Sequence, residues 1–268
     1  MRTNPRPNPC SIGFFYPENY GPYLSTRDFR DSLQHSTGWL RWIHNTIFST
    51  NPKPLPTLPP GKLLEIGCAS GSFLHEMNRQ GWQVEGIEFS KSVAEYARSK
   101  GYTVRVGALE SLSGRHHDYD LIVGWHVLEH LHDPVSSLKK LHAWAKPGGW
   151  LVLSLPDAGA LEFKIFKDAW YALMLPTHLF HFTTSTLDKM LRLAGWRVER
   201  IIWEENPKNL LASLSYCCRD RHWTKLASFI SDVGDGRRLA HLRILLGKLL
   251  ARLHNSGRIV VWTTRIEA

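Results

Sequence analysis

The sequence lacks the features of a membrane-spanning or a disulfide-stabilised protein. No apolar run reaches the roughly 20 residues that a helix needs to cross a bilayer. The N-terminal stretch MRTNPRPNPC contains no apolar segment of the kind found in a signal peptide. The cysteines, Cys10, Cys68, Cys217 and Cys218, show neither metal-ligand spacing nor a pattern of paired bridges. We therefore expect a cytoplasmic protein in a reducing compartment.

Excess charge is confined to the two ends of the chain. The net charge is +9, yet residues 61–204 contain 16 basic and 16 acidic residues. Residues 1–60 contain 6 basic and 3 acidic residues, and residues 205–268 contain 11 and 5. A basic flank can attract nucleic acid, an anionic membrane or a phosphorylated substrate, or can serve solubility alone. Because the middle is neutral and no RNA-binding module is recognisable, nucleic acid is not the expected partner.

A glycine-rich stretch lacks the spacing of a dinucleotide-binding site. Residues 63–73 read LLEIGCASGSF, in which an apolar run and Glu65 precede Gly67 and Gly71. This order predicts a buried strand, a tight turn and the start of a helix. Ala69 stands where a dinucleotide fingerprint has its second glycine, and the third glycine is missing. A cradle for two phosphates is therefore poorly specified.

Four stretches of the chain resemble the class I S-adenosylmethionine-dependent methyltransferases. Residues 65–71 resemble motif I of that family, E/D-x-G-x-x-x-G. Residues 127–130 read VLEH after an apolar run, and residues 146–149 read KPGG before the next one. Residues 177–183, THLFHFT, with LDKMLRLAGW after them, resemble a subgroup that acts on diverse small molecules. The resemblance covers residues 60–204 and the final strand.

The resemblance implies an α/β fold with a Rossmann-like, seven-stranded sheet. Its strand order would be 3-2-1-4-5-7-6, with strand seven antiparallel and helices on both faces. The strands are expected near residues 63–66, 82–89, 102–106, 119–125, 150–155, 196–203 and 258–264. Thr184 or Ser185 is expected to cap the helix that covers residues 187–193.

The chain divides into two expected parts. Residues 1–60 form an N-terminal segment with a helical cap and a proline-rich linker, and residues 61–268 form the methyltransferase domain. A helical insertion at residues 205–256 precedes the last strand. Near its end, leucines recur on one face of a basic helix (Leu239, Leu242, Leu246, Leu249 and Leu253). We favour packing of these leucines on their own domain, with peripheral membrane contact through residues 237–254 as the alternative.

The resemblance also implies the cofactor and the residues that hold it. S-adenosylmethionine would be the methyl donor and S-adenosylhomocysteine the product. Glu88 lies about 20 residues after the glycine turn, where such folds place the acid that binds the ribose hydroxyls. Ala108 and Leu109 stand where the family often has an Asp near the adenine, so contact there would be apolar or through the backbone. The full set of expected cofactor residues is Glu65, Gly67, Cys68, Ala69, Gly71, Phe73, Glu88, Phe89, Ala108, Leu109 and Trp125.

Histidines are the candidate general bases, because the imidazole titrates near neutral pH. His126 and His130 follow the fourth strand, and His178 and His181 follow an insertion at residues 157–176. All four are expected near the carboxyl edge of the sheet, although each has a purely structural alternative. His178 ranks first because it follows the insertion that would wall the acceptor pocket. No third metal ligand is apparent beside His178 and His181, so no metal is expected.

These features together predict a methyltransferase that acts on O, N or C of a small molecule, such as a sugar, a glycan-lipid or a quinone-like precursor. Four aromatic residues are candidates for the lid or the acceptor pocket (Trp39, Trp42, Trp170 and Tyr171). Two alternatives stay open: an RNA methyltransferase, and a module that binds the cofactor without catalysis. The acceptor and the oligomeric state are not predicted.

Overall fold

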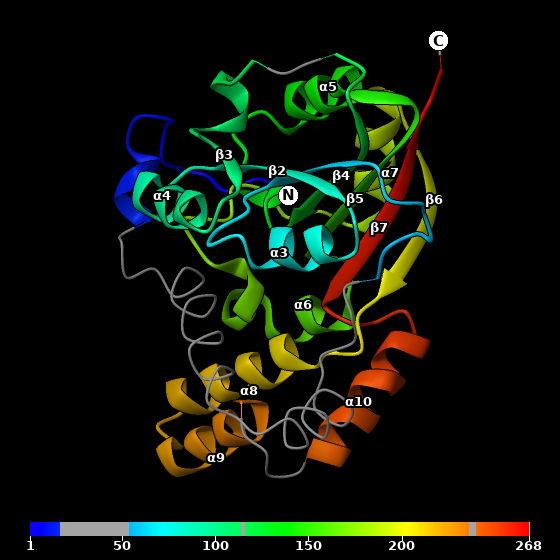
Figure 1. The fold of residues 1–268 in the computed structure, drawn as a ribbon. Helices are drawn as coiled ribbons and strands as arrows, with labels where there is room; N and C mark the ends of the chain where they lie inside the picture. Colours follow the sequence, from blue (N-terminus) through cyan, green and yellow to red (C-terminus); the bar gives the residue numbers. More distant parts are fainter. Residues whose placement is uncertain (17–53, 114–115, 236–239, 268) are drawn as a thin grey trace, which may run out of the picture.

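The computed structural model describes residues 1–16, 54–113, 116–235 and 240–267 (Figure 1). The helical cap expected within the N-terminal segment, with Trp39 and Trp42, lies outside the described residues. The N-terminal residues that are described run along the protein, and Arg2 forms a bridge with Phe180. A short 3-10 helix, Ile12–Phe15, follows.

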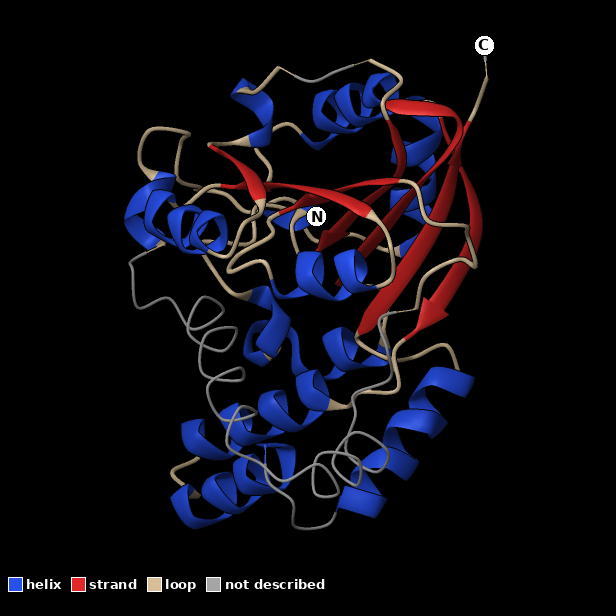
Figure 2. Ribbon diagram, in the orientation of Figure 1, coloured by secondary structure: helices blue, strands red, loops and turns tan. Residues whose placement is uncertain are grey.

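A seven-stranded sheet forms the centre of the molecule (Figure 2). Its order is β3-β2-β1-β4-β5-β7-β6, as predicted. The first five strands pair in parallel, and β7 is antiparallel to both β5 and β6. The strands are β1 Lys62–Ile66, β2 Gln83–Glu88, β3 Thr103–Val106, β4 Tyr119–Trp125, β5 Ala145–Pro156, β6 Trp196–Trp203 and β7 Arg258–Arg265.

Apolar side chains of the sheet point to both faces, and each face is covered by helices. Leu63 packs with α3, Ser72–Arg79, and α4, Lys91–Ser99. Its neighbour Leu64 packs on the opposite face with α5, Pro134–Trp144, and α7, Thr184–Leu193. This arrangement explains why β4, β5 and β7 contain continuous apolar runs rather than alternating patterns.

Helix α7 begins at Thr184, three residues before the predicted start at Leu187. Its N-cap is Thr183, whose hydroxyl accepts the backbone N–H of Thr186 at 3.2 Å. The hydroxyl of Thr186 accepts the N–H of Thr183 in return, at 2.9 Å. The prediction of Thr184 or Ser185 was wrong because the reciprocal partner, a Thr three residues after the cap, replaces the usual Glu or Gln.

Helices outside the sheet layers form a second body below it in Figure 1. In the sequence, helix α6, Leu161–Phe166, follows β5. Three further helices connect β6 to β7: α8, Lys208–Asp220, α9, Thr224–Asp235, and α10, Ala240–Arg252. Leu242 and Leu249 of α10, and Leu253 directly after it, stay 58%, 52% and 59% exposed. The expectation that these three leucines pack on their own domain is therefore wrong. Among the described residues, no helix combines the length and apolar character needed to cross a bilayer.

Candidate active site

A cavity of about 780 Å³ lies where the parallel strands end. Its lining follows the carboxyl ends of β1 to β5 in turn: Glu65 to Ala69, Glu88 and Phe89, Gly107 to Glu110, Trp125 to Val127, and Pro156. Open α/β sheets bind their ligands at this edge, and the volume is that of a typical small-molecule site. The sheet therefore brings together residues that are far apart in the sequence.

A glycine corner closes one end of this cavity. Gly67 has a φ of +68°, and a Cβ atom built on it would meet Cγ2 of Val127 at 2.5 Å. Only glycine fits this position without displacing a neighbour. The carboxylate of Glu88 accepts the backbone N–H groups of Ala69 at 2.9 Å and Ser90 at 2.8 Å. Glu88 thus ties the end of β2 to the turn after β1, and its carboxylate lies at the cavity wall.

Every residue expected to hold the cofactor lines this cavity, except Gly71. Gly71 has a φ of +78° and is the N-cap of α3. A Cβ atom on it would approach Tyr102 at 3.2 Å and Ala97 at 3.3 Å. The structure therefore gives Gly71 a role in turning the chain and in close packing, rather than in approach to a ligand.

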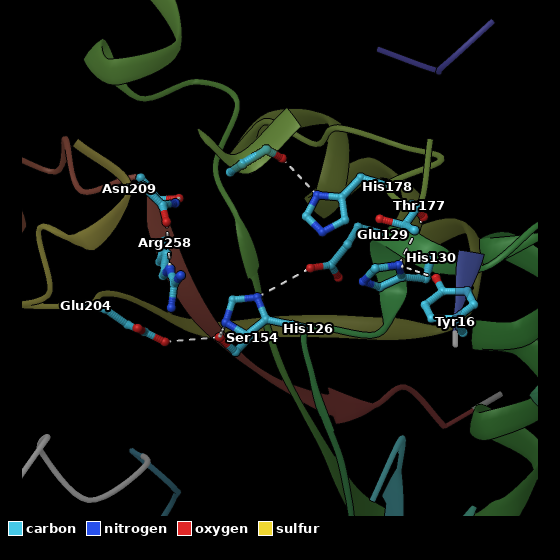
Figure 3. A network of polar contacts seen from close by, with 12 residues as sticks. Tyr16, His126, Glu129, His130, Ser154, Thr177, His178, Glu204, Asn209 and Arg258 are labelled. Atoms are coloured by element: carbon cyan, nitrogen blue, oxygen red, sulfur yellow. Dashed lines mark hydrogen bonds and ion pairs between the residues drawn. The ribbon is translucent and has the colours of Figure 1, made fainter. Parts of the chain in front are cut away.

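Three of the four candidate histidines, His126, His130 and His178, line the same cavity. Glu129, which is 1% exposed, is not part of the lining but lies among these histidines (Figure 3). His181 is buried outside the lining, and its Nε2 lies 3.1 Å from the carbonyl oxygen of Leu173. His181 therefore fits its structural alternative, a histidine that packs in the interior.

Backbone carbonyls orient two of these imidazoles. Nδ1 of His178 lies 2.8 Å from the carbonyl oxygen of Ala172, and Nδ1 of His130 lies 3.0 Å from that of Thr177. A carbonyl only accepts, so each Nδ1 carries the proton and each Nε2 keeps a lone pair when the ring is neutral. The two rings meet edge to face, with centroids 4.7 Å apart. The hydroxyl of Tyr16 also lies 2.7 Å from Nδ1 of His130.

Glu129 and His126 are joined by a hydrogen bond beside the cavity. Nδ1 of His126 donates to Oε1 of Glu129 at 3.3 Å, and the His126 side chain is 35% exposed. Its backbone has a φ of +56°, a conformation in which His is enriched among non-glycine residues. The N–H of His126 donates to the carbonyl of Ser154 at 2.8 Å. This bond ties the turn after β4 to β5 and fixes the His126 ring at the cavity.

Burial separates the protonation states of these groups. Desolvation lowers the pKa of His178 to about 3 and also lowers the pKa of His130. Desolvation alone would raise the pKa of Glu129, but the hydrogen bond from His126 and the charges of nearby histidines hold this pKa at about 2. At neutral pH the cluster therefore contains an ionised carboxylate beside two neutral imidazoles.

A family model described as "Methyltransferase domain" matches residues 26–201. The chain belongs to the class I S-adenosylmethionine-dependent methyltransferases. A ubiquinone biosynthesis O-methyltransferase from Nitrosospira multiformis is 30% identical over 153 residues, which are 52% of this chain and 64% of that protein. For other curated relatives of this name, the match spans between 51% and 64% of their length.

Solved methyltransferase structures share the fold. An S-adenosylmethionine-dependent methyltransferase from Mesorhizobium loti aligns with a TM-score of 0.55 and 18% identity, covering 79% of this chain and 94% of that one. Phosphoethanolamine N-methyltransferase 2 from Haemonchus contortus, solved in complex with S-adenosyl-L-methionine, aligns with a TM-score of 0.53 and 16% identity. That alignment covers 90% of this chain and 60% of the Haemonchus protein.

The methyltransferase site also contains residues that sequence reasoning missed. Glu129 does not line the cavity but contacts the histidine cluster, and it belongs to the VLEH motif, which could have identified it as a site residue. Tyr16 lines the cavity from the N-terminal segment, and no sequence signal marks it. Of the expected lid aromatics, Tyr171 lines the cavity, whereas Trp170 is 2% exposed and its indole nitrogen donates to Glu162 at 3.4 Å. Trp170 is therefore a core residue.

Proposed function

We propose that this methyltransferase moves a methyl group from S-adenosylmethionine to a hydroxyl oxygen of a small phenol of the quinone-precursor type. One observation supports this most: a single cavity extends from the glycine corner to the histidine cluster. A methyl donor at the corner would then face an acceptor beside His126. The O-methyltransferase name of the relative at 30% identity favours oxygen as the acceptor atom.

The corner suits a nucleoside that carries no phosphate. The Glu88 carboxylate would accept hydrogen bonds from both ribose hydroxyls, since each of its oxygens has a second lone pair. Phe89, Ala108 and Leu109 would contact the adenine, and Glu110 at the same wall offers carboxylate oxygens to its amino group. Glu65 would stand near the amino-acid end of the donor. The bound sulfonium would supply an already activated methyl group.

His126 is our candidate for the group that accepts the acceptor's proton. It is the histidine of the cluster that is hydrogen-bonded to the buried Glu129, and this carboxylate would stabilise the ring once it has taken up a proton. His178, ranked first from the sequence, has its pKa lowered to about 3 by burial, so it is a weak base at neutral pH. The transfer is an in-line displacement, for which the enclosed cavity mainly positions the two reactants.

The experiment is a transfer assay with S-adenosylmethionine labelled in its methyl group. Apolar ortho-dihydroxybenzenes, primary amines and short RNA are offered in parallel, and products are identified by mass spectrometry. We expect methyl ethers of the phenols alone. Transfer to amines or RNA alone would contradict the proposal, as would folded protein that binds the donor and methylates nothing.

A His126→Ala variant tests the base. A positioned general base increases the reaction rate about a hundredfold or more. We therefore expect kcat to fall roughly a hundredfold at neutral pH, while the affinity for S-adenosylmethionine stays unchanged. His75→Gln, an exposed substitution on α3, is the control. An unchanged kcat in His126→Ala would remove His126 from this role.

A further inference from the structure

We propose that Glu129, His130 and His178 bind one divalent transition-metal ion at the acceptor end of the cavity. One potential ligand atom from each residue lies within 4.8 Å of the other two. Around Zn²⁺, with ligands about 2.0–2.2 Å from the ion, such atoms stand roughly 3–4 Å apart. Small side-chain rotations would therefore complete the site. This proposal departs from the expectation from sequence that no metal is bound, because Glu129 offers a third ligand atom beside two histidines.

An unpartnered carboxylate oxygen points to a cation. Oε1 of Glu129 accepts from His126, but Oε2 is buried and has no hydrogen-bond partner. Glu129 is 1% exposed. A buried carboxylate oxygen without a partner is costly, so native proteins rarely leave one uncompensated. A metal ion at this oxygen removes the cost.

The two imidazoles are already arranged as ligands. Their Nδ1 atoms are tied to the carbonyls of Thr177 and Ala172, and Figure 3 shows the second nitrogen of each ring turned toward the Glu129 carboxylate. Metal-binding histidines generally donate their other N–H to a carbonyl or a carboxylate in this way. The Tyr16 hydroxyl adds a further contact at Nδ1 of His130.

The ligand set indicates the class of ion and its purpose. Two imidazoles and one carboxylate suit Zn²⁺, Co²⁺, Mn²⁺ or Fe²⁺, whereas Ca²⁺ and Mg²⁺ prefer oxygen ligands alone. Three protein ligands beside a cavity are typical of catalytic sites, where the remaining position takes water or substrate.

The catalytic use of the ion rests on the function proposed above, but its binding does not. The ion would lower the pKa of an acceptor hydroxyl. The hydroxyl would give its proton to His126, and His126 would then release this proton to water. The oxygen's electron pair then forms the bond to the methyl carbon. The carbon–sulfur bond breaks with its electron pair on sulfur, which releases S-adenosylhomocysteine.

Titration of chelator-treated, tag-free protein with Co²⁺ and with Zn²⁺ tests the site. We expect one equivalent of either ion to bind, with visible d–d absorption bands for Co²⁺ and their loss when Zn²⁺ is added. Glu129→Gln and His178→Gln should each weaken binding at least tenfold. His75→Gln, on α3 and outside the cluster, should bind as the wild type does. Circular dichroism and titration with S-adenosylmethionine establish that each variant is folded.

The outcomes separate the two proposals. Folded wild-type protein that binds S-adenosylmethionine but neither Co²⁺ nor Zn²⁺ would overturn the metal site and leave the proposed function standing. Metal affinity that is unchanged in both cluster variants would also overturn it. Stoichiometric metal binding without methyl transfer to any phenol would support the site and contradict the proposed function.

Discussion

Glu88 shows how one side chain can organise the donor half of the cavity. Its carboxylate fixes the backbone after β1 through Ala69 and starts α4 through Ser90, while it faces the cavity. Such a residue is recognisable from the sequence, because a turn and the end of the next strand are separated by a nearly constant length of chain. The sequence alone therefore predicts Glu88 as the acid that binds the ribose.

We predict that Glu88→Ala weakens S-adenosylmethionine binding at least tenfold. Hydrogen bonds to a charged group contribute about 1.5–3 kcal/mol each, and two ribose hydroxyls would lose their acceptor. Isothermal titration measures the change, with Glu95→Ala, an exposed carboxylate on α4, as the matched control. Unchanged affinity in Glu88→Ala would reject the ribose assignment.

Glu162 predicts a pH dependence of stability. Its carboxyl is buried near Trp170, and burial raises its pKa from 4.5 to about 7. Because the folded state holds this proton more tightly than the unfolded chain, the stability contributed by Glu162 is lost as pH rises from about 4.5 to 7.

The loss amounts to roughly 3 kcal/mol. Glu162→Gln should abolish it, so urea unfolding at pH 5 and at pH 8 should show the variant gaining stability over wild type only at pH 8. Equal stability differences at the two pH values would contradict this account.

The acceptor half was less accessible to sequence reasoning. Glu129 and His130 are adjacent in the VLEH motif, but His178 reaches them from 48 residues further along the chain. No sequence periodicity predicts that His178 lies beside Glu129, because this contact depends on how the insertion after β5 folds back over the sheet. The sequence thus identified the histidines but not their common carboxylate.

At the scale of elements, strands were predicted better than helix surfaces. β4 and β6 match their predicted ranges. β4 is an apolar run that is buried on both faces, which leaves few alternatives, whereas β6 has one buried residue and its limits are given by Trp196 and Trp203. Helix α10 was also placed well, yet the exposure of its leucines was not predicted. A helical pattern reveals an apolar face, but only the tertiary structure determines what covers that face.

We predict that α10 contacts anionic membranes. Leu242 and Leu249 are more than half exposed, and Arg243, Lys248 and Arg252 lie on the same helix. Insertion of a half-exposed leucine contributes about 1 kcal/mol, so the double substitution Leu242→Glu and Leu249→Glu should reduce vesicle binding tenfold or more. Co-sedimentation with phosphatidylglycerol vesicles provides the measurement.

Leu193→Glu, an exposed position on α7, is the control. The prediction would be contradicted if the wild-type protein did not bind the vesicles, or if the double variant bound them as strongly as the wild type does.

At the scale of the whole molecule, the cavity is assembled from nearly the full length of the described chain. Its lining runs from Ile12 to Arg258, and Lys208 and Asn209 reach it from α8. The donor end comes from the regular βα units and follows from their pattern. The acceptor end combines the turn after β4 with the N-terminal segment and the insertions, and no local pattern specifies the conformations of those last two parts. The class of enzyme is therefore readable from the sequence, while the acceptor is not.

Calorimetric titration of the purified full chain with S-adenosylmethionine tests the central claim most directly. The account predicts saturable binding at one site per chain and displacement by S-adenosylhomocysteine, because one cavity has the glycine corner and Glu88 at its wall. Folded protein that releases no binding heat at several temperatures, and gains no thermal stability from the donor, would contradict it.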